Sequence, residues 1–168
     1  MKRSTINKIL LWSLVLLLMV AIYALSAQDS VESSALSGKT IRLIADLLVP
    51  GFDHLSTGQQ AQLVQEWQNN VRKIAHLTIY MMLGAACLMA LLQHKLSNQV
   101  QVAGALGISV VYAISDEIHQ FFVSGRSLQV SDVFIDGLGA LIGVSIVLVI
   151  VRLMSKKAQP RVASRVTG

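Results

Sequence analysis

Four long apolar stretches follow one another along the chain, at residues 9–26, 74–92, 100–122 and 131–154. Each is close to the roughly 20 residues that a helix needs to cross the hydrocarbon core of a bilayer. Backbone polar groups in that core must be satisfied within the segment, which favours helices. The pattern therefore predicts an all-α integral membrane bundle of about four transmembrane helices, in a single domain covering residues 1–168.

The segment between the first two stretches, residues 27–73, has a different pattern. Apolar residues recur there at roughly helical spacing until Pro50-Gly51 interrupts them: Leu36, Ile41, Ile44, Leu47 and Leu48. This predicts one or two amphipathic helices lying at the membrane surface. Thr57 and Gln60 then form a predicted capping box, after which apolar positions lead into the second stretch: Val64, Trp67, Val71 and Ile74.

Composition and charge narrow the class of protein further. Hydrophobic residues make up 54% of the chain and charged residues 14%, with a mean hydropathy of +0.61, which excludes an ordinary soluble domain. The net charge of +5 does not indicate nucleic-acid binding, because the basic residues flank the apolar stretches instead of forming a patch with aromatic residues. The single cysteine, Cys87, excludes an intramolecular disulfide and a cysteine-based metal cluster.

The flanking charges also predict the topology. Three basic residues precede the first stretch, and five lie at the end of the last stretch or after it. The positive-inside rule therefore places both termini, including the tail at residues 155–168, in the cytoplasm. Residues 27–73 carry four basic and five acidic residues and are predicted to lie outside. The N-terminus resembles a signal peptide ending near Ser26, but its apolar run of about 17 residues exceeds the usual 7–15, which favours a retained span.

Ionisable residues gather where the second, third and fourth stretches meet the predicted outer face. Each costs about 2.5–3.5 kcal/mol at the centre of a membrane helix, so such a gathering is informative. One interpretation is a polar network that pairs helices; the other is a binding site for a polar head group. For the site, the candidate catalytic residues are His119, Asp116, His76 and Glu117, and the candidate substrate-binding residues are Arg72, Lys73, Tyr80, Gln120, Arg126, Ser127, Asp132 and Asp136.

The residue types suggest how these roles divide. Arginine binds phosphate through two parallel hydrogen bonds, so Arg72 and Arg126 are candidates for an anion. Asp116 lies three residues before His119 and is spaced to orient that imidazole for proton transfer. No metal ion or other cofactor is predicted: the HExxH spacing is absent, and a metal bound by Asp116, Glu117, His119 and His76 is a minor alternative. A role for Ser127 as a nucleophile has even less support than this metal site.

Glycines in the last two stretches predict close helix packing. Gly139 and Gly143 form a GxxxG step in the fourth, and Gly104 and Gly107 in the third offer a surface that could receive it. His94 beside Lys95 is expected to be a solvated residue of a cytoplasmic loop, and Trp12 is expected to face lipid.

Three motif blocks resemble the VanZ-like family of bacterial membrane proteins. They are residues 71–84, which include Arg72, His76 and Tyr80; residues 115–127, read SDEIHQFFVSGRS; and Asp132 and Asp136 with Gly137, Gly139 and Gly143. The chain has Ser124 where the family often has proline and Asp136 where it often has asparagine. The second difference puts in doubt any family role that needs an uncharged group there.

The resemblance implies a multi-pass protein of the bacterial inner membrane, in a family whose namesake is associated with low-level teicoplanin resistance. It supplies no established reaction. We expect a protein that acts at the outer face on a polar or phosphorylated envelope lipid head group, as a hydrolase or transferase if it is an enzyme. Its partners would be the bilayer and such a lipid. The alternative is a non-enzymatic structural or assembly factor whose polar residues pair helices.

Overall fold

The protein is all-helical in the part of the chain that the computed structural model describes, residues 2–27, 38, 41–124 and 129–158. Four long helices are α1 (Lys2–Ser26), α3 (Thr57–Leu91), α4 (Asn98–Phe121) and α5 (Val130–Ala158). Residues 41–48 are also helical, and a short 3-10 helix, η1 (Phe52–His54), follows them. The predicted fold class is confirmed.

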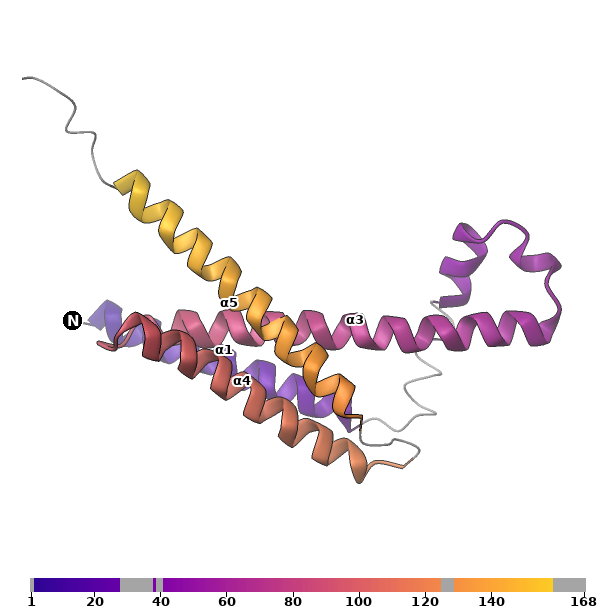
Figure 1. Ribbon diagram of the computed structural model, residues 1–168, viewed down its shortest axis with the longest axis horizontal. Helices are drawn as coiled ribbons and strands as arrows, with labels where there is room; N and C mark the ends of the chain where they lie inside the picture. Colours follow the sequence, from indigo (N-terminus) through magenta and orange to yellow (C-terminus); the bar gives the residue numbers. More distant parts are fainter. Residues whose placement is uncertain (1, 28–37, 39–40, 125–128, 159–168) are drawn as a thin grey trace, which may run out of the picture.

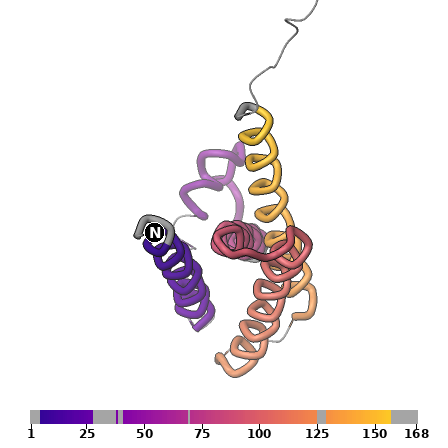
Figure 2. Tube along the Cα trace, turned by 90° about the vertical axis from the view of Figure 1, so that its left-hand side faces the viewer, coloured from indigo at the N-terminus to yellow at the C-terminus, as the bar shows by residue number. Residues whose placement is uncertain are grey.

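Helix α3 lies at the centre of the bundle and contacts α1, α4 and α5 (Figures 1 and 2). Successive long helices alternate in direction, so the C-terminal ends of α1 and α4 lie near the start of α5 (Figure 1). We call this end of the bundle the site end. The opposite end holds the N-terminus of α1 and the connection between α3 and α4. The placement of both termini on the cytoplasmic side remains a prediction.

Three described helices are long and apolar enough to cross a membrane: Thr5–Ser26, Thr57–Leu91 and Val130–Lys156 each contain an 18-residue stretch whose mean hydropathy is 2.5, 1.9 and 2.5, respectively. The protein is therefore a multi-pass membrane protein. The predicted span at 100–122 corresponds to α4, which is not among the three. Polar residues buried along α4 lower its mean hydropathy: Gln101, Ser109, Asp116, Glu117 and Gln120. Its crossing remains a prediction.

Helix α3 is longer than the predicted span at 74–92. Its 35 residues extend roughly 50 Å at 1.5 Å per residue, well beyond the roughly 30 Å hydrocarbon core. The predicted capping box is present, but one residue earlier than predicted: the Ser56 hydroxyl accepts from the Gln59 N–H, and the Gln59 side chain accepts from the Ser56 N–H. The Thr57 and Gln60 assignment was wrong, and Gln60 instead donates to the Phe52 and Leu55 carbonyls.

A small second hydrophobic core lies on the N-terminal part of α3. Ile41, Ala45, Phe52 and Val64 are its buried residues, and Gly51 turns the chain with a φ of 78° that favours glycine. This packing buries only part of the predicted apolar face. Ile41 is buried, whereas Leu47 and Leu48 remain 84% and 65% exposed, because the helix uses its Ile41-Ala45 face against α3.

The two helices in closest contact, α3 and α5, meet through glycines. A Cβ at Gly139 would collide with the Leu77 carbonyl, and one at Gly143 with the Met81 carbonyl. The GxxxG step therefore packs on α3. The expectation that Gly104 and Gly107 receive it was wrong: Gly104 faces a Leu91 side chain, and nothing lies within 4 Å of a Cβ built at Gly107.

At the opposite end of the bundle, Trp12 and His94 join α1 to the connection between α3 and α4. The Trp12 indole N–H donates to His94 Nε2 at 3.1 Å, and the rings meet edge-on. The solvated His94 expected from the sequence is not found, since its ring is partly buried against Trp12. This contact holds the non-site end of α1 against its neighbours.

Candidate functional site

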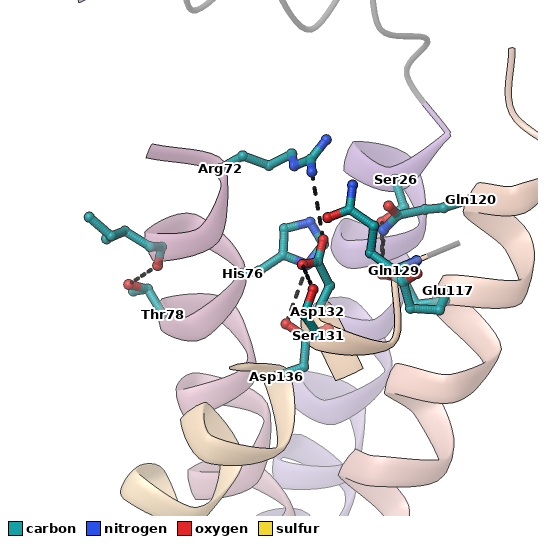
Figure 3. A network of polar contacts seen from close by, with 12 residues as sticks. Ser26, Arg72, His76, Thr78, Glu117, Gln120, Gln129, Ser131, Asp132 and Asp136 are labelled. Atoms are coloured by element: carbon teal, nitrogen blue, oxygen red, sulfur yellow. Dashed lines mark hydrogen bonds and ion pairs between the residues drawn. The ribbon is translucent and has the colours of Figure 1, made fainter. Parts of the chain in front are cut away.

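Polar side chains from all four long helices converge at the site end (Figure 3). Arg72, His76 and Tyr80 follow one face of α3 at intervals of four residues, as helical geometry requires. The other helices contribute a buried set: Ser26 from α1, Asp116, Glu117 and Gln120 from α4, and Asp132 and Asp136 from α5. We call these nine residues the polar cluster.

Two close contacts between a basic and an acidic side chain connect α3 to α5. Arg72 Nη2 lies 3.7 Å from Asp132 Oδ2, and His76 Nδ1 lies 3.4 Å from Asp136 Oδ1 (Figure 3). The two helices run in the same direction (Figure 1), and both pairs have the same four-residue spacing. The glycine contacts one turn further along α5 bring the backbones close enough for these short acidic side chains to reach α3.

A closed group of three hydrogen bonds joins α1 to α4. Asp116 Oδ2 accepts from the Ser26 hydroxyl at 3.0 Å and from the Gln120 amide at 3.0 Å, and the same amide donates to the Ser26 oxygen at 3.2 Å. Ser26 is 1% exposed. Buried polar groups are stable when they are hydrogen-bonded in this way, so this part of the cluster holds the two helix ends together.

The predicted pair of Asp116 and His119 is not formed. Asp116 has Ser26 and Gln120 as partners, while the His119 ring stacks on Tyr23 of α1 with centroids 4.4 Å apart. The three-residue spacing allowed both side chains to share a face of α4, but packing against α1 gives them different neighbours. The carboxylate that lies beside an imidazole is Asp136, next to His76.

Glu117 has a structural contact at the start of α5. Its Oε2 accepts from the Gln129 backbone N–H at 2.8 Å, one residue before the helix begins. Free N–H groups at a helix start are commonly satisfied by such acceptors. The contact positions α5, and with it Asp132 and Asp136, relative to α4.

Several buried polar atoms of the site end have no hydrogen-bond partner. In the described part of the chain these are Arg72 Nε, His76 Nδ1, Tyr80 Oη, His119 Nε2 and both carboxylate oxygens of Asp136. The contact between His76 and Asp136 is thus close enough for an ion pair but is not aligned as a hydrogen bond. Since most buried polar groups in proteins are paired, unpaired groups concentrated at one place call for an explanation.

The remaining predicted site residues lie apart from the cluster or cannot be placed. Lys73 is exposed on α3, next to Arg72. Arg126 and Ser127 lie outside the described residues. The sequence interpretation missed Ser26, Tyr23 and Gln129 as neighbours of the site. Ser26 carried one usable signal, because it is polar and lies one helical turn after Ile22 on a face that is buried.

Together, these features define a multi-pass helical membrane protein with a buried cluster of ionisable residues at one end of its bundle. Residues 11–152 match the family model described as VanZ/LLP1, a range that includes every described residue of the polar cluster. The chain belongs to the VanZ/LLP1 family. No curated protein and no solved structure matches it.

Proposed function

We propose that this protein binds the polar, phosphate-bearing head group of an envelope lipid at the site end, which faces outward in a bacterial inner membrane. The observation that supports this most strongly is the set of unpaired buried atoms around His76 and Asp136. A network that only pairs helices gains its stability from satisfied hydrogen bonds. Unpaired donors and acceptors cost about 1–3 kcal/mol each, so keeping several together favours a ligand that satisfies them.

Arg72 is the residue proposed to contact the phosphate. Its side chain is 31% exposed, its contact with Asp132 spans 3.7 Å, and its Nε has no partner, so the guanidinium retains donors for an anion. Lys73 adds a second exposed positive charge beside it. A head group approaching from the membrane surface would meet these two residues before the buried carboxylates.

His76 lies one helical turn deeper than Arg72 and is the residue proposed to transfer a proton. Asp136 beside it can stabilise the imidazolium that a proton transfer would create. If the protein is an enzyme, this pair fits a hydrolase or a transferase acting on a lipid-linked substrate. Asp116 then has a positioning role through Ser26 and Gln120, and His119 a secondary one beside Tyr23.

Thermal unfolding of the purified protein in detergent, with and without added lipid, tests the proposal. Phosphatidic acid should raise the unfolding temperature of the wild type, whereas diacylglycerol, which has the same acyl chains and no phosphate, should not. Binding of a ligand to the folded state alone produces such a shift. The shift should be lost in Arg72→Gln and kept in the exposed control Glu66→Gln. Equal shifts with both lipids, or an undiminished shift in Arg72→Gln, would rule out phosphate recognition.

We further propose a role in glycopeptide resistance, which is more specific than lipid binding and rests on family membership. Deleting the gene should lower the inhibitory concentration of teicoplanin, and restoring wild type but not His76→Ala should recover it. Immunoblots of membranes must give equal levels of the two proteins. Unchanged susceptibility in the deletion strain would remove this role without affecting lipid binding.

The alternative function is that of a non-enzymatic membrane factor whose polar residues pair helices. The closed hydrogen bonds of Ser26, Asp116 and Gln120 favour it, because every group there has a partner. Under this alternative, substituting any cluster residue should lower the unfolding temperature, and the purified protein should retain no phosphate-bearing lipid. Mass spectrometry of the lipids that co-purify with it distinguishes the two.

A further inference from the structure

Three side chains from three different helices place their potential metal ligands close together. One ligand atom each from His76 of α3, Asp116 of α4 and Asp136 of α5 lie within 4.8 Å of one another. Residues this far apart in the sequence share no spacing motif, so the set becomes visible only once the helices are packed. It differs from the set of Asp116, Glu117, His119 and His76 considered from the sequence.

The second observation is that the buried Asp136 carboxylate makes no hydrogen bond. Its side chain is 0% exposed, and neither carboxylate oxygen has a hydrogen-bond partner. His76 Nδ1, 3.4 Å away, is also without one. A buried carboxylate in this state is normally paired with a positive charge or coordinates a metal ion.

The charges around the three residues also favour a bound cation. In the described part of the chain, the one arginine or lysine within ion-pair distance of a cluster carboxylate is Arg72, and it pairs with Asp132. Asp116 and Asp136 therefore place two acidic groups near each other and near His76, with no fixed positive charge paired to either. A divalent cation would neutralise both.

Asp116, the proposed ligand on α4, is oriented by hydrogen bonds from neighbouring side chains, as metal ligands usually are. Both hydrogen bonds to Asp116, from Ser26 and from Gln120, fall on Oδ2, which fixes the direction of the carboxylate and leaves Oδ1 available. Hydrogen bonds of this kind around a ligating carboxylate or histidine commonly orient it and tune its affinity.

We propose that His76, Asp116 and Asp136 bind a divalent transition-metal ion such as Zn²⁺ or Mn²⁺. Imidazole nitrogen together with carboxylate oxygen suits these ions, whereas Mg²⁺ and Ca²⁺ prefer oxygen alone. Three protein ligands leave a coordination position open for water or for a phosphate oxygen, as in catalytic metal sites. Ligand atoms now up to 4.8 Å apart would draw together around the ion. The proposal stands on these residues and does not require the lipid proposal; with an ion bound, His76 would be a ligand and would not transfer the proton.

Metal binding to the full chain tests it directly. Protein carrying no histidine tag is purified in detergent, treated with a chelator and titrated with Zn²⁺ or Mn²⁺ by calorimetry, without added lipid. Mass spectrometry then measures the metal that remains after gel filtration. We expect about one ion per chain, and binding at least about tenfold weaker in His76→Gln, Asp116→Asn and Asp136→Asn. A Co²⁺-loaded sample should show a visible spectrum that changes in His76→Gln.

Glu66→Gln is the control, since it neutralises a carboxylate of α3 that is exposed and lies outside the polar cluster. It should bind one ion with wild-type affinity. Circular dichroism and gel filtration establish that every variant remains folded. Wild type without saturable binding, or binding that survives all three ligand substitutions, would overturn the proposal. Because no lipid is present, failure here leaves the phosphatidic acid experiment unaffected.

Discussion

Asp136 of α5 is completely buried, and its Oδ1 lies 3.4 Å from Nδ1 of His76 on α3 without either atom making a hydrogen bond. The pair lies one helical turn below the contact of Arg72 with Asp132 and above the glycine contacts of the same two helices. Functional groups kept unsatisfied in a buried position usually lower the stability of the folded state. This relationship leads to the first prediction.

Asp136→Asn should not destabilise the metal-free protein. The substitution keeps the shape of the side chain and removes a buried charge that lacks hydrogen-bond partners, so we expect an unchanged free energy of unfolding or a gain of up to about 1 kcal/mol. Thermal unfolding in detergent with a chelator measures this. A loss of more than about 2 kcal/mol would mean that the carboxylate stabilises the bundle, as the structural alternative requires.

Gly143→Ala should strongly disturb the bundle. The added methyl group would collide with the Met81 carbonyl of α3, and backbone cannot move aside as a flexible side chain can. Overpacking of this kind costs about 1–3 kcal/mol or more. Gly107→Ala is the control, because open space surrounds its position and alanine favours helix by about 1 kcal/mol. Unfolding temperatures that fall equally in the two variants would contradict the close α3–α5 contact.

Ser26→Ala should separate the end of α1 from α4. It removes a donor to Asp116 and an acceptor for Gln120, both buried, and we expect a loss of about 1–3 kcal/mol. Ser145→Ala is the matched control: Ser145 is exposed and donates within its own helix to the Leu141 carbonyl. Its substitution should change the unfolding temperature little. Equal effects would mean that the three-way hydrogen bonding does not hold α1.

The orientation of the bundle can be tested with single cysteines. Cys87 is buried, so a Cys87→Ser background leaves one reactive thiol when Gln65→Cys or Lys95→Cys is added, both at exposed positions. If the termini are cytoplasmic, a membrane-impermeant maleimide should label position 65 in intact cells and position 95 only after lysis. The reverse pattern would place the polar cluster on the cytoplasmic side and contradict the predicted outer site.

The sequence by itself determined the class of protein and much of its architecture. Apolar stretches of membrane-spanning length, a helical period and flanking charge are properties of neighbouring residues, so they can be read along the chain. For the same reason the four-residue intervals of Arg72, His76 and Tyr80 already indicated a shared face. The predicted N-cap of α3 was wrong by one residue, because Ser56 and Thr57 are adjacent and either residue type can cap a helix.

Only the tertiary structure decided which polar residues meet. Asp116 was paired with His119 by spacing, yet it bonds Ser26, 90 residues earlier, and His76 lies beside Asp136 instead. These partners depend on how far one helix slides and turns against another, which is set by shape: glycines at 139 and 143 fit against the Leu77 and Met81 carbonyls and fix the register of α5 on α3. A periodic pattern records which face of a helix is buried, but not which residues of another helix lie opposite it.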